Sequence, residues 1–370
     1  MKRLTLAEAS AILIGTQIGA GVLGLPYALR EAGPILGVIV IILTGLLTLL
    51  TALFVLEVAS KSEGKSLSKL TEEHLGKFGG ILMFMSISIL AYGALIAYIA
   101  GSADILSSLL GIRAEIVAMI FWLVMSLIVF MGLKTSGEAE LILNGVLLSA
   151  IIISIVLVFG NISPEYIRYA NSSAALRGVG VALFAYVSHM VIPELLKGLK
   201  DVRITTKAVF VGYLTPMILY ALFILAFIGA FGPETPELAT KVLEGLYGSL
   251  GRWIGLLLPL AAICTSYIGI ALSQMDNIRE MLGCSKISSW FLAVVPPLAI
   301  YFAGLKSFVN ALWLAGTFGG VIYAGILPTL MYLKVKKKEV NFHLHIPHGI
   351  VYLSGLVFLM VFVYSLASLV

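Results

Sequence analysis

Only a few residues of this sequence could carry out chemistry within its long apolar runs, because acidic, basic and histidine side chains are scarce there. Of the five histidines, His189 lies well inside such a run. An ionisable side chain in an apolar span is a functional candidate by default, and small changes of environment move a histidine across neutral pH. We interpret His189 in three ways: as a structural hydrogen-bonding residue, as a substrate contact, or as a group that carries a proton.

Three carboxylates form the second group of candidates. Glu194 lies in the same run as the histidine, and Asp276 and Glu280 lie near one end of a later run. They could pair with Lys2 or Arg3 as a gate that closes the inner path. The alternative is that they lie at the membrane–water interface without such a role.

Two adjacent hydroxyls, Thr265 and Ser266, occupy another apolar run. Such hydroxyls usually bond to a carbonyl one turn back in their own helix, which is the structural interpretation. The alternative is that they face the free backbone carbonyls of an interrupted helix nearby. Two hydroxyls and three carbonyls form a shell of oxygens without formal charge, which suits a hard monovalent cation such as Na⁺.

Four glycines and a proline interrupt the first apolar run between Gly15 and Pro26. Glycine in a helix interior costs roughly 1 kcal/mol relative to alanine, and proline about 3 kcal/mol. We therefore expect a spanning helix that breaks near Gly19 to Gly21 and restarts before Pro26. Irregular backbone inside a membrane must be satisfied by protein or by a wet cavity, and the restarted helix offers N–H groups suited to a carboxylate. The alternative interpretation is a glycine-rich face for helix packing.

A second interruption falls in the same register. The segment Gly19-Ala20-Gly21 lies seven to five residues before Pro26, and Tyr186-Val187-Ser188 lies seven to five residues before Pro193. The two segments belong to the first and sixth of the spans that we expect, so they enter from opposite sides. Interrupted segments at matching positions of two halves predict an inverted repeat, with a binding site near the midplane between them.

The composition requires a polytopic α-helical membrane protein. Of the 370 residues, 60% are hydrophobic and 12% are charged, whereas soluble domains are about 25% charged. The mean hydropathy is +1.07. We place eleven spans at about 7–30, 34–60, 78–110, 115–133, 136–160, 174–199, 205–232, 252–282, 287–304, 307–333 and 349–369. They form one transmembrane domain, with repeat one at about 7–160, repeat two at about 174–333 and an extra helix at about 349–369.

Most of the 24 Lys and Arg residues fall on one side of this arrangement, together with the N-terminus. By the positive-inside rule that side is cytoplasmic, and an odd number of spans puts the C-terminus outside the cell membrane. The net charge of +5 is therefore no sign of nucleic-acid binding. The sequence contains no nucleotide-binding loop, metal-ligand cluster or nucleophile motif, so we expect neither an enzyme nor a bound cofactor. The expected partners are the lipid bilayer and a small ligand, without an obligate protein partner.

The segment from Gly19 to Ala28, followed by Ala32-Gly33 and Gly37, resembles the first-helix signature of amino acid/auxin permease-type transporters. These belong to the amino acid-polyamine-organocation superfamily. Further segments that resemble its hydroxy and aromatic amino acid permease branch are Ala97–Gly101, His189 with Ile192-Pro193, and Thr265–Gly269. The resemblance covers essentially the whole chain. It implies a leucine-transporter-type fold, which is a 5+5 inverted repeat plus one extra helix, with helices 1 and 6 broken.

The resemblance also implies roles for individual residues. The carboxylate of an amino acid substrate would be held by the backbone amides of Ala20, Gly21 and Val22. Its ammonium group would be received by Thr16 and by open carbonyls near Phe184 and Ala185. Its side chain would be surrounded by Tyr98, Phe184, Tyr186, Ser188 and Ile270. In cation-coupled members, Na⁺ would rest on the carbonyls of Gly15, Ile18 and Ala262 and the hydroxyls of Thr265 and Ser266.

The function that the resemblance implies is secondary active transport of neutral L-amino acids, aromatic or otherwise apolar, by cation-coupled symport and alternating access. A carboxylate is absent from both breaks, which argues against a cationic substrate. Na⁺ is favoured over H⁺ because the spacings Gly15-x-x-Ile18 and Ala262-x-x-Thr265-Ser266 fit the sodium site. Proton-coupled symport stays open, since the family includes proton-driven branches. An uncoupled channel or a nutrient receptor is the less favoured alternative, because no continuous polar path and no soluble output domain can be recognised.

Overall fold

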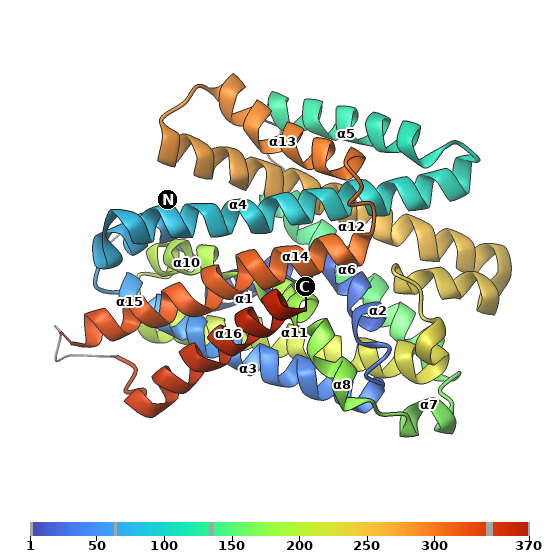
Figure 1. Cartoon of the computed structure of the whole chain (residues 1–370), viewed down its shortest axis with the longest axis horizontal. Helices are drawn as coiled ribbons and strands as arrows, with labels where there is room; N and C mark the ends of the chain where they lie inside the picture. Colours follow the sequence, from blue (N-terminus) through green and yellow to red (C-terminus); the bar gives the residue numbers. More distant parts are fainter. Residues whose placement is uncertain (1–2, 63–64, 133–136, 338–342, 369–370) are drawn as a thin grey trace.

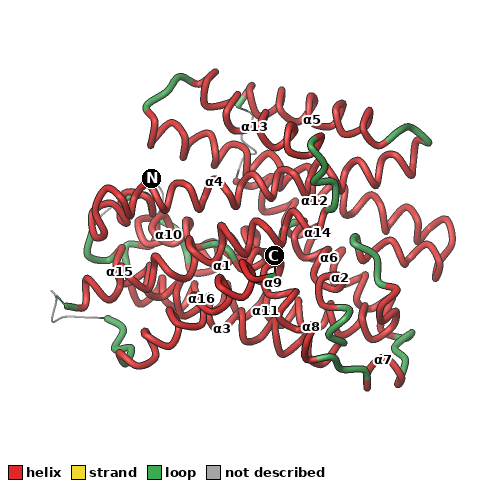
Figure 2. Tube along the Cα trace, in the orientation of Figure 1, coloured by secondary structure: helices red, strands yellow, loops and turns green. Residues whose placement is uncertain are grey.

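The computed structural model describes residues 3–62, 65–132, 137–337 and 343–368, and these residues form helices and loops without any strand (Figures 1 and 2). The first elements are α1 (Leu6–Gln17), η1 (Ala20–Gly24), α2 (Leu25–Leu29), α3 (Pro34–Ala59), α4 (Leu67–Leu110), α5 (Ala114–Met131), α6 (Gly137–Phe159), α7 (Pro164–Arg168), α8 (Ser172–Ala175), η2 (Leu176–Gly178) and α9 (Val179–Tyr186). They continue with η3 (His189–Val191), α10 (Ile192–Leu199), α11 (Val202–Phe231), η4 (Gly232–Glu234), η5 (Ala239–Val242), α12 (Leu243–Leu282), α13 (Lys286–Phe302), α14 (Phe308–Leu314), η6 (Ala315–Ile326), α15 (Leu327–Lys336) and α16 (His348–Ala367). The η elements are 3₁₀-helical, except that η6 is a π-helix.

Eight helical segments in the described ranges are long and apolar enough to cross a membrane. There are nine when α1 and the segment Ala20–Leu29, which bend by 45° where they meet, are counted as one span. Two further apolar helices, Asn144–Phe159 and Lys286–Phe302, are shorter. Large apolar side chains such as Leu43 and Ile218 are exposed on the spans, as contact with lipid requires. The predicted polytopic α-helical membrane protein is thereby confirmed.

The two longest helices are each divided by one glycine. α4 has 44 residues and α12 has 40, and both contain a kink. The kinks lie at Gly76, where φ is 83°, and at Gly248, where φ is 58°. Glycine adopts such positive φ angles without the steric cost that a side chain would add. The spans predicted at 78–110 and 252–282 begin just after these two glycines.

The packing of the bundle centres on α11 and α4. α11 packs along α3 and α1, while α4 packs along α12 and η6. In Figure 1, α4 runs across most of the molecule, with α5 and α13 above it and α1, α3 and α16 below it. The π-helix η6 contacts α4, α9 and α16, and so it connects these groups of helices.

Small residues allow η6 to approach its neighbours until backbone meets backbone. A Cβ added at Gly316 would lie 1.8 Å from the carbonyl oxygen of Gly180 in α9. A Cβ added at Gly319 would lie 2.7 Å from the backbone nitrogen of Leu90 in α4. Helices inside membranes commonly use small residues to pack this closely. The position of α9, which ends in the second helix break, is therefore fixed by the glycines of η6.

Candidate functional site

The first helix break lies at Ile18 and Gly19. α1 ends at Gln17, Gly19 has an extended backbone (φ −114°, ψ −163°), and η1 begins at Ala20. Pro26 lies in the first turn of α2, where its missing N–H group costs no helical hydrogen bond. The break thus begins one residue before the predicted segment, and the helix restarts before Pro26 as the sequence predicts.

The second break has the same construction. α9 ends at Tyr186, and neither Val187 (φ −72°, ψ 106°) nor Ser188 (φ −142°, ψ 12°) is helical. The single 3₁₀ turn η3 follows, and Pro193 then lies in the first turn of α10. Both breaks therefore consist of a helix end, two non-helical residues, a 3₁₀ segment and a helix whose second residue is proline. The predicted interruption at Tyr186 to Ser188 coincides with this backbone.

The two breaks are in contact. A Cβ added at Gly21 would lie 2.8 Å from Cε1 of Phe184, so the phenyl ring at the end of α9 rests directly on the glycine backbone. The hydroxyl of Tyr220 in α11 donates to the carbonyl of Gln17 at 2.7 Å and to that of Ala185 at 3.2 Å. One phenol thus bonds carbonyls from both interrupted helices, and no role was predicted for this tyrosine from the sequence.

The backbone groups expected to hold a carboxylate lie at the start of η1. The N–H group of Ala20 donates to Oγ of Ser266 at 3.4 Å, and that of Val22 donates to the carbonyl of Gly19 at 3.4 Å. Ser266, which comes from α12, is therefore brought to the first break, as its predicted role requires. A carboxylate that bound here would compete with the serine hydroxyl for the Ala20 amide.

The groups expected to receive an ammonium ion have partners within the protein. The hydroxyl of Thr16 is exposed and donates to the carbonyl of Ile12 at 2.7 Å. The carbonyl of Phe184 accepts the N–H group of Val187 at 3.3 Å, and the carbonyl of Ala185 accepts the phenol of Tyr220. These acceptors therefore all lie near the breaks, and each is engaged by a neighbour in this structure.

The residues expected to surround a substrate side chain are mostly buried. Tyr98, Tyr186 and Ser188 are buried, whereas Phe184 and Ile270 are half-buried. The phenol of Tyr98 lies beside the hydroxyl of Ser266. The hydroxyl of Tyr186 has no hydrogen-bond partner in the described part of the chain.

The expected sodium ligands approach the first break only in part. The hydroxyl of Thr265 donates to the carbonyls of Ala261 and Ala262 in its own helix, at 3.2 Å and 3.1 Å. Ile18, whose carbonyl is another expected ligand, is buried within the break itself. Gly15 lies against Asn144 of α6, since a Cβ added at the glycine would lie 2.1 Å from Nδ2 of the asparagine.

The expected inner gate has other contacts. Nε of Arg3 donates to the carbonyl of Leu199 at 3.1 Å, and Glu280 accepts the hydroxyl of Ser66 at 2.8 Å. Glu194 and Asp276 are exposed, and among the described residues no ion pair joins Arg3 to either of them or to Glu280. Lys2, the other expected partner, lies outside the described residues.

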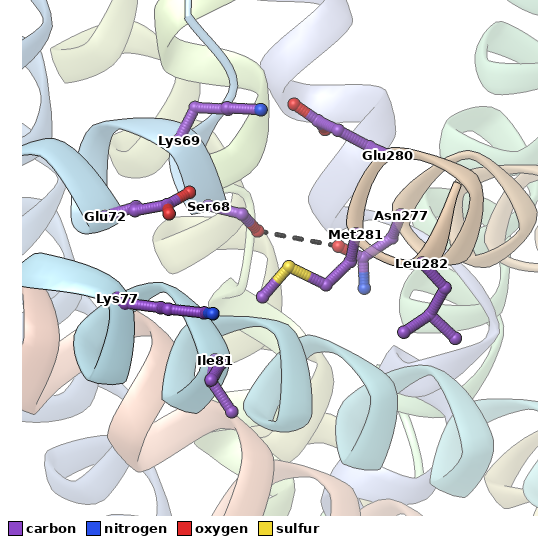
Figure 3. Close-up of a pocket in the computed structure, with 9 residues that line it drawn as sticks. All are labelled: Ser68, Lys69, Glu72, Lys77, Ile81, Asn277, Glu280, Met281 and Leu282. Carbon is purple, nitrogen blue, oxygen red and sulfur yellow. Dashed lines mark hydrogen bonds between the residues drawn. The ribbon is translucent and has the colours of Figure 1, made fainter.

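Glu280 instead lines a cleft at this end of the bundle, between the start of α4 and the end of α12 (Figure 3). The cleft has a volume of about 420 Å³ and includes Lys69, Glu72 and Lys77. A hydrogen bond of 3.5 Å between Ser68 and Asn277 crosses it, as Figure 3 shows. No residue of the two breaks lines this cleft.

His189 belongs to a buried group of polar side chains that the sequence only partly revealed. Gln17 donates to Ser188 at 3.0 Å, and Ser188 donates to Tyr213 of α11 at 3.0 Å. The two ring nitrogens of His189 bond Tyr213 at 3.4 Å and Thr51 of α3 at 3.0 Å. Gln17, a polar residue within the glycine-rich run, was a signal for this group. A second signal was that Tyr213 and Tyr220 are seven residues apart and so share a helix face.

Two interrupted helices that meet at buried polar groups within a helical membrane protein define a membrane transporter rather than an enzyme. The chain matches the Tryptophan/tyrosine permease family over residues 2–367, and it belongs to that family. The predicted resemblance to the aromatic amino acid permease branch is thereby confirmed.

Individual relatives span nearly the whole chain at low identity. Glutamine transporter 2 of Aliivibrio fischeri is 23% identical, over 91% of this chain and 92% of its own. The Tyrosine-specific transport system 1 of Haemophilus influenzae is 27% identical, over 89% and 88%. The Tryptophan-specific transport protein of Shigella flexneri is 25% identical, over 88% and 86%. The alignments thus cover most of this chain and most of each relative.

Proposed function

We propose that this protein is a secondary active transporter that moves neutral L-amino acids across the cell membrane by alternating access. The observation that carries this proposal is the contact between the two helix breaks, where Phe184 rests on Gly21 and Tyr220 bonds carbonyls of both. Transporters with broken helices bind the charged ends of their substrates at such exposed backbone groups. The names of the relatives support the substrate class, because tryptophan, tyrosine and glutamine are all neutral amino acids.

We propose the 5+5 inverted repeat plus one extra helix as the arrangement of the spans. The matching construction of the two breaks supports it, and so does the presence of apolar helices at Asn144–Phe159 and Lys286–Phe302. These two shorter helices would be the fifth and ninth of eleven spans. The repeats would cover about 7–160 and 174–333, with the N-terminus in the cytoplasm and the C-terminus outside.

The substrate would bind where the two breaks meet. Its carboxylate would take the N–H groups of Ala20, Gly21 and Val22, and would replace Ser266 at the first of them. Its ammonium group would bind carbonyls at the end of α9, and Phe184 would move off Gly21 to admit it. Tyr98 and Tyr186, with their aromatic rings, would favour a large apolar side chain.

The coupling ion that we propose is the proton. Ser266 accepts the amide N–H of Ala20, which places a positive hydrogen at one of the oxygens expected to bind Na⁺, and Thr265 donates its proton to carbonyls of its own helix, among them the expected ligand Ala262. His189, in contrast, is fully buried and hydrogen-bonded through both ring nitrogens. Na⁺ held by the carbonyls of Gly15, Ile18 and Ala262 and by both hydroxyls remains the competing assignment.

A thermal-shift panel of the purified protein with the twenty amino acids tests the substrate class. A ligand that binds only the folded state stabilises it by about 2.7 kcal/mol at a hundredfold excess over Kd. We expect one or more neutral amino acids to raise the melting temperature in Na⁺-free buffer, and acidic or basic ones to leave it unchanged. Stabilisation that requires Na⁺ would favour the sodium assignment. No response to any amino acid would contradict the proposal.

The variant Gly21→Ala tests the binding place. Its Cβ would push against Phe184 and occupy the space of the carboxylate, so we expect amino acid stabilisation to disappear while the protein still folds. Gly145→Ala is the matched control, because a Cβ added there meets nothing within 4 Å. Wild-type ligand response in the Gly21 variant would contradict the proposed place.

A further inference from the structure

A chain of four hydrogen bonds runs from the first helix break to α3. It joins Gln17 to Ser188, Ser188 to Tyr213, Tyr213 to Nδ1 of His189, and Nε2 of His189 to Thr51, over 3.0, 3.0, 3.4 and 3.0 Å. All five residues are buried, the most exposed being Gln17 at 3%. Both helix breaks contribute to this chain, so any change along it affects both.

The neighbours of Thr51 fix the direction of these bonds. Its hydroxyl donates to the carbonyls of Leu47 at 3.3 Å and Thr48 at 3.1 Å, so it accepts a hydrogen bond from His189. Nε2 then carries the proton of the neutral imidazole, and Nδ1 accepts the hydroxyl proton of Tyr213. The histidine end of the chain therefore has one defined polarity.

The same polarity continues to the other end. Because Tyr213 donates to the imidazole, it accepts from Ser188, and Ser188 accepts from the amide nitrogen of Gln17. The amide oxygen Oε1 of Gln17 has no hydrogen-bond partner within the described ranges, although it is buried. A buried acceptor without a donor is unfavourable, so this end of the chain is an acceptor that lacks a hydrogen-bond donor.

A proton added to His189 would reverse the chain. Nδ1 would become a donor, and the hydroxyl of Tyr213 would have to turn away from it toward Ser188. The hydroxyl of Ser188 would turn in the same way, and the Gln17 amide would rotate so that Oε1 takes the place of Nε2 and accepts the proton of Ser188. The acceptor that lacks a partner in the neutral chain is thus the one that the reversed chain would satisfy.

We propose, on the basis of the proposed function, that His189 takes up the coupling proton and that reversal of the direction of these hydrogen bonds transmits the effect of its protonation to the first helix break. The substrate's carboxylate at that break would supply the counter-charge. Substrate and proton would therefore stabilise each other in the binding site, and Tyr213 and Ser188 would act as positioning residues between them.

The surroundings of His189 contain no competing charge in the part of the chain that the structure describes. The titratable groups that face it are phenols, Tyr213 from α11 and Tyr323 from η6, whose rings lie 6.3 Å and 5.8 Å from the imidazole. α3 contributes the hydroxyl of Thr51, and Glu194 in the adjoining α10 is exposed. No ion pair holds the histidine, so a counter-charge would have to come from a ligand.

The wild-type protein provides the first test, by measurement of Kd for L-tryptophan, L-tyrosine and L-glutamine in Na⁺-free buffer at several pH values. Between about pH 5.5 and 8 these amino acids keep their charge, so a change of Kd reports protons taken up by the protein. If binding takes up one proton, Kd rises about tenfold per pH unit above the pKa of the free protein's group. A Kd that stays constant over this range would overturn the proposal.

Three variants assign the proton to the chain. We expect His189→Gln and Tyr213→Phe to bind the amino acid with a Kd that no longer depends on pH. Tyr323→Phe is the matched control, because its phenol also packs on the imidazole but accepts the backbone N–H of Met190 outside the chain. We expect it to keep the wild-type pH dependence.

The outcomes separate this proposal from the proposed function. Wild-type pH dependence retained in His189→Gln or Tyr213→Phe would overturn the chain while amino acid binding stands. Loss of the pH dependence in Tyr323→Phe alone would place the proton pathway at η6 and overturn the chain as well. Absence of amino acid binding by the wild type at every pH would instead contradict the proposed function. If one of the two chain variants does not fold, the pH dependence of the other still decides the question.

Discussion

The hydroxyl of Tyr220 links the two helix breaks through a single proton. It bonds the carbonyls of Gln17 and Ala185, which their interrupted helices leave without intrahelical partners. Buried carbonyls of this kind must find a donor from somewhere, because water is absent from the membrane core. Tyr186, whose ring lies 5.3 Å from that of Tyr220, has a buried hydroxyl without a partner. Two neighbouring tyrosines thus differ sharply in what their hydroxyls contribute.

This difference gives a paired prediction for stability. Tyr220→Phe would leave the buried carbonyl of Ala185 without its donor, at a cost of about 1–3 kcal/mol, while the carbonyl of Gln17 would keep the N–H of Gly19. Tyr186→Phe would remove an unsatisfied polar group and should leave the stability equal or higher. Thermal melting of both purified variants in detergent checks this, and the Tyr220 variant should melt at the lower temperature. Equal melting temperatures would show that the bridge contributes nothing to stability.

At the scale of single residues, the sequence predicted the structural role of the glycines better than the contacts of the polar side chains. Gly19 and Gly21 stand out because glycine and proline are unusual in a spanning helix. Gln17 and Tyr213 carry no such signal alone, since their partners lie about 170 and 24 residues away in the chain. Which acceptors are already occupied, such as the carbonyl of Ala185 that accepts the phenol of Tyr220, also depends on tertiary contacts that no local pattern contains. The assignment of substrate and ion ligands therefore remains a prediction.

At the scale of elements, the π-helix η6 positions the second break. Its glycines face the backbones of α9 and α4, and Tyr323 in its last part accepts the backbone N–H of Met190 in η3. π-helical segments are rare and often mark functional sites. The sequence predicts one ordinary span at 307–333, because the apolar composition of this region fits any helix. The wider π geometry depends on the close packing of its neighbours and could not be predicted.

The close approach of η6 to α9 can be tested with two glycines. In Gly316→Ala the new Cβ would clash with the backbone of Gly180, so the helices must separate at a cost of about 1–3 kcal/mol. In Gly320→Ala the nearest atom would lie 3.6 Å away, which is an ordinary contact. We expect a lower melting temperature and a lower yield of folded protein for the first variant only. Equal behaviour of the two variants would contradict the assigned role of η6.

At the scale of the whole molecule, the composition and the two interruptions were enough to predict the class of protein. The apolar runs indicated a polytopic helical bundle, and the matching positions of Pro26 and Pro193 indicated two related breaks. The number of spans is less directly encoded, because α4 and α12 continue through kinks and the helices Asn144–Phe159 and Lys286–Phe302 are short. The orientation rests on the distribution of lysine and arginine alone.

The central claim is that this molecule uses an ion gradient to accumulate a neutral amino acid. The measurement that tests it most directly is the uptake of radiolabelled L-tryptophan, L-tyrosine or L-glutamine by proteoliposomes. An inward proton gradient would be imposed with Na⁺ absent, and a protonophore would serve as the control. We predict accumulation of at least one of the three above the external concentration, and its collapse when the protonophore is added. No uptake of any of them, with or without a proton or sodium gradient, would contradict the claim.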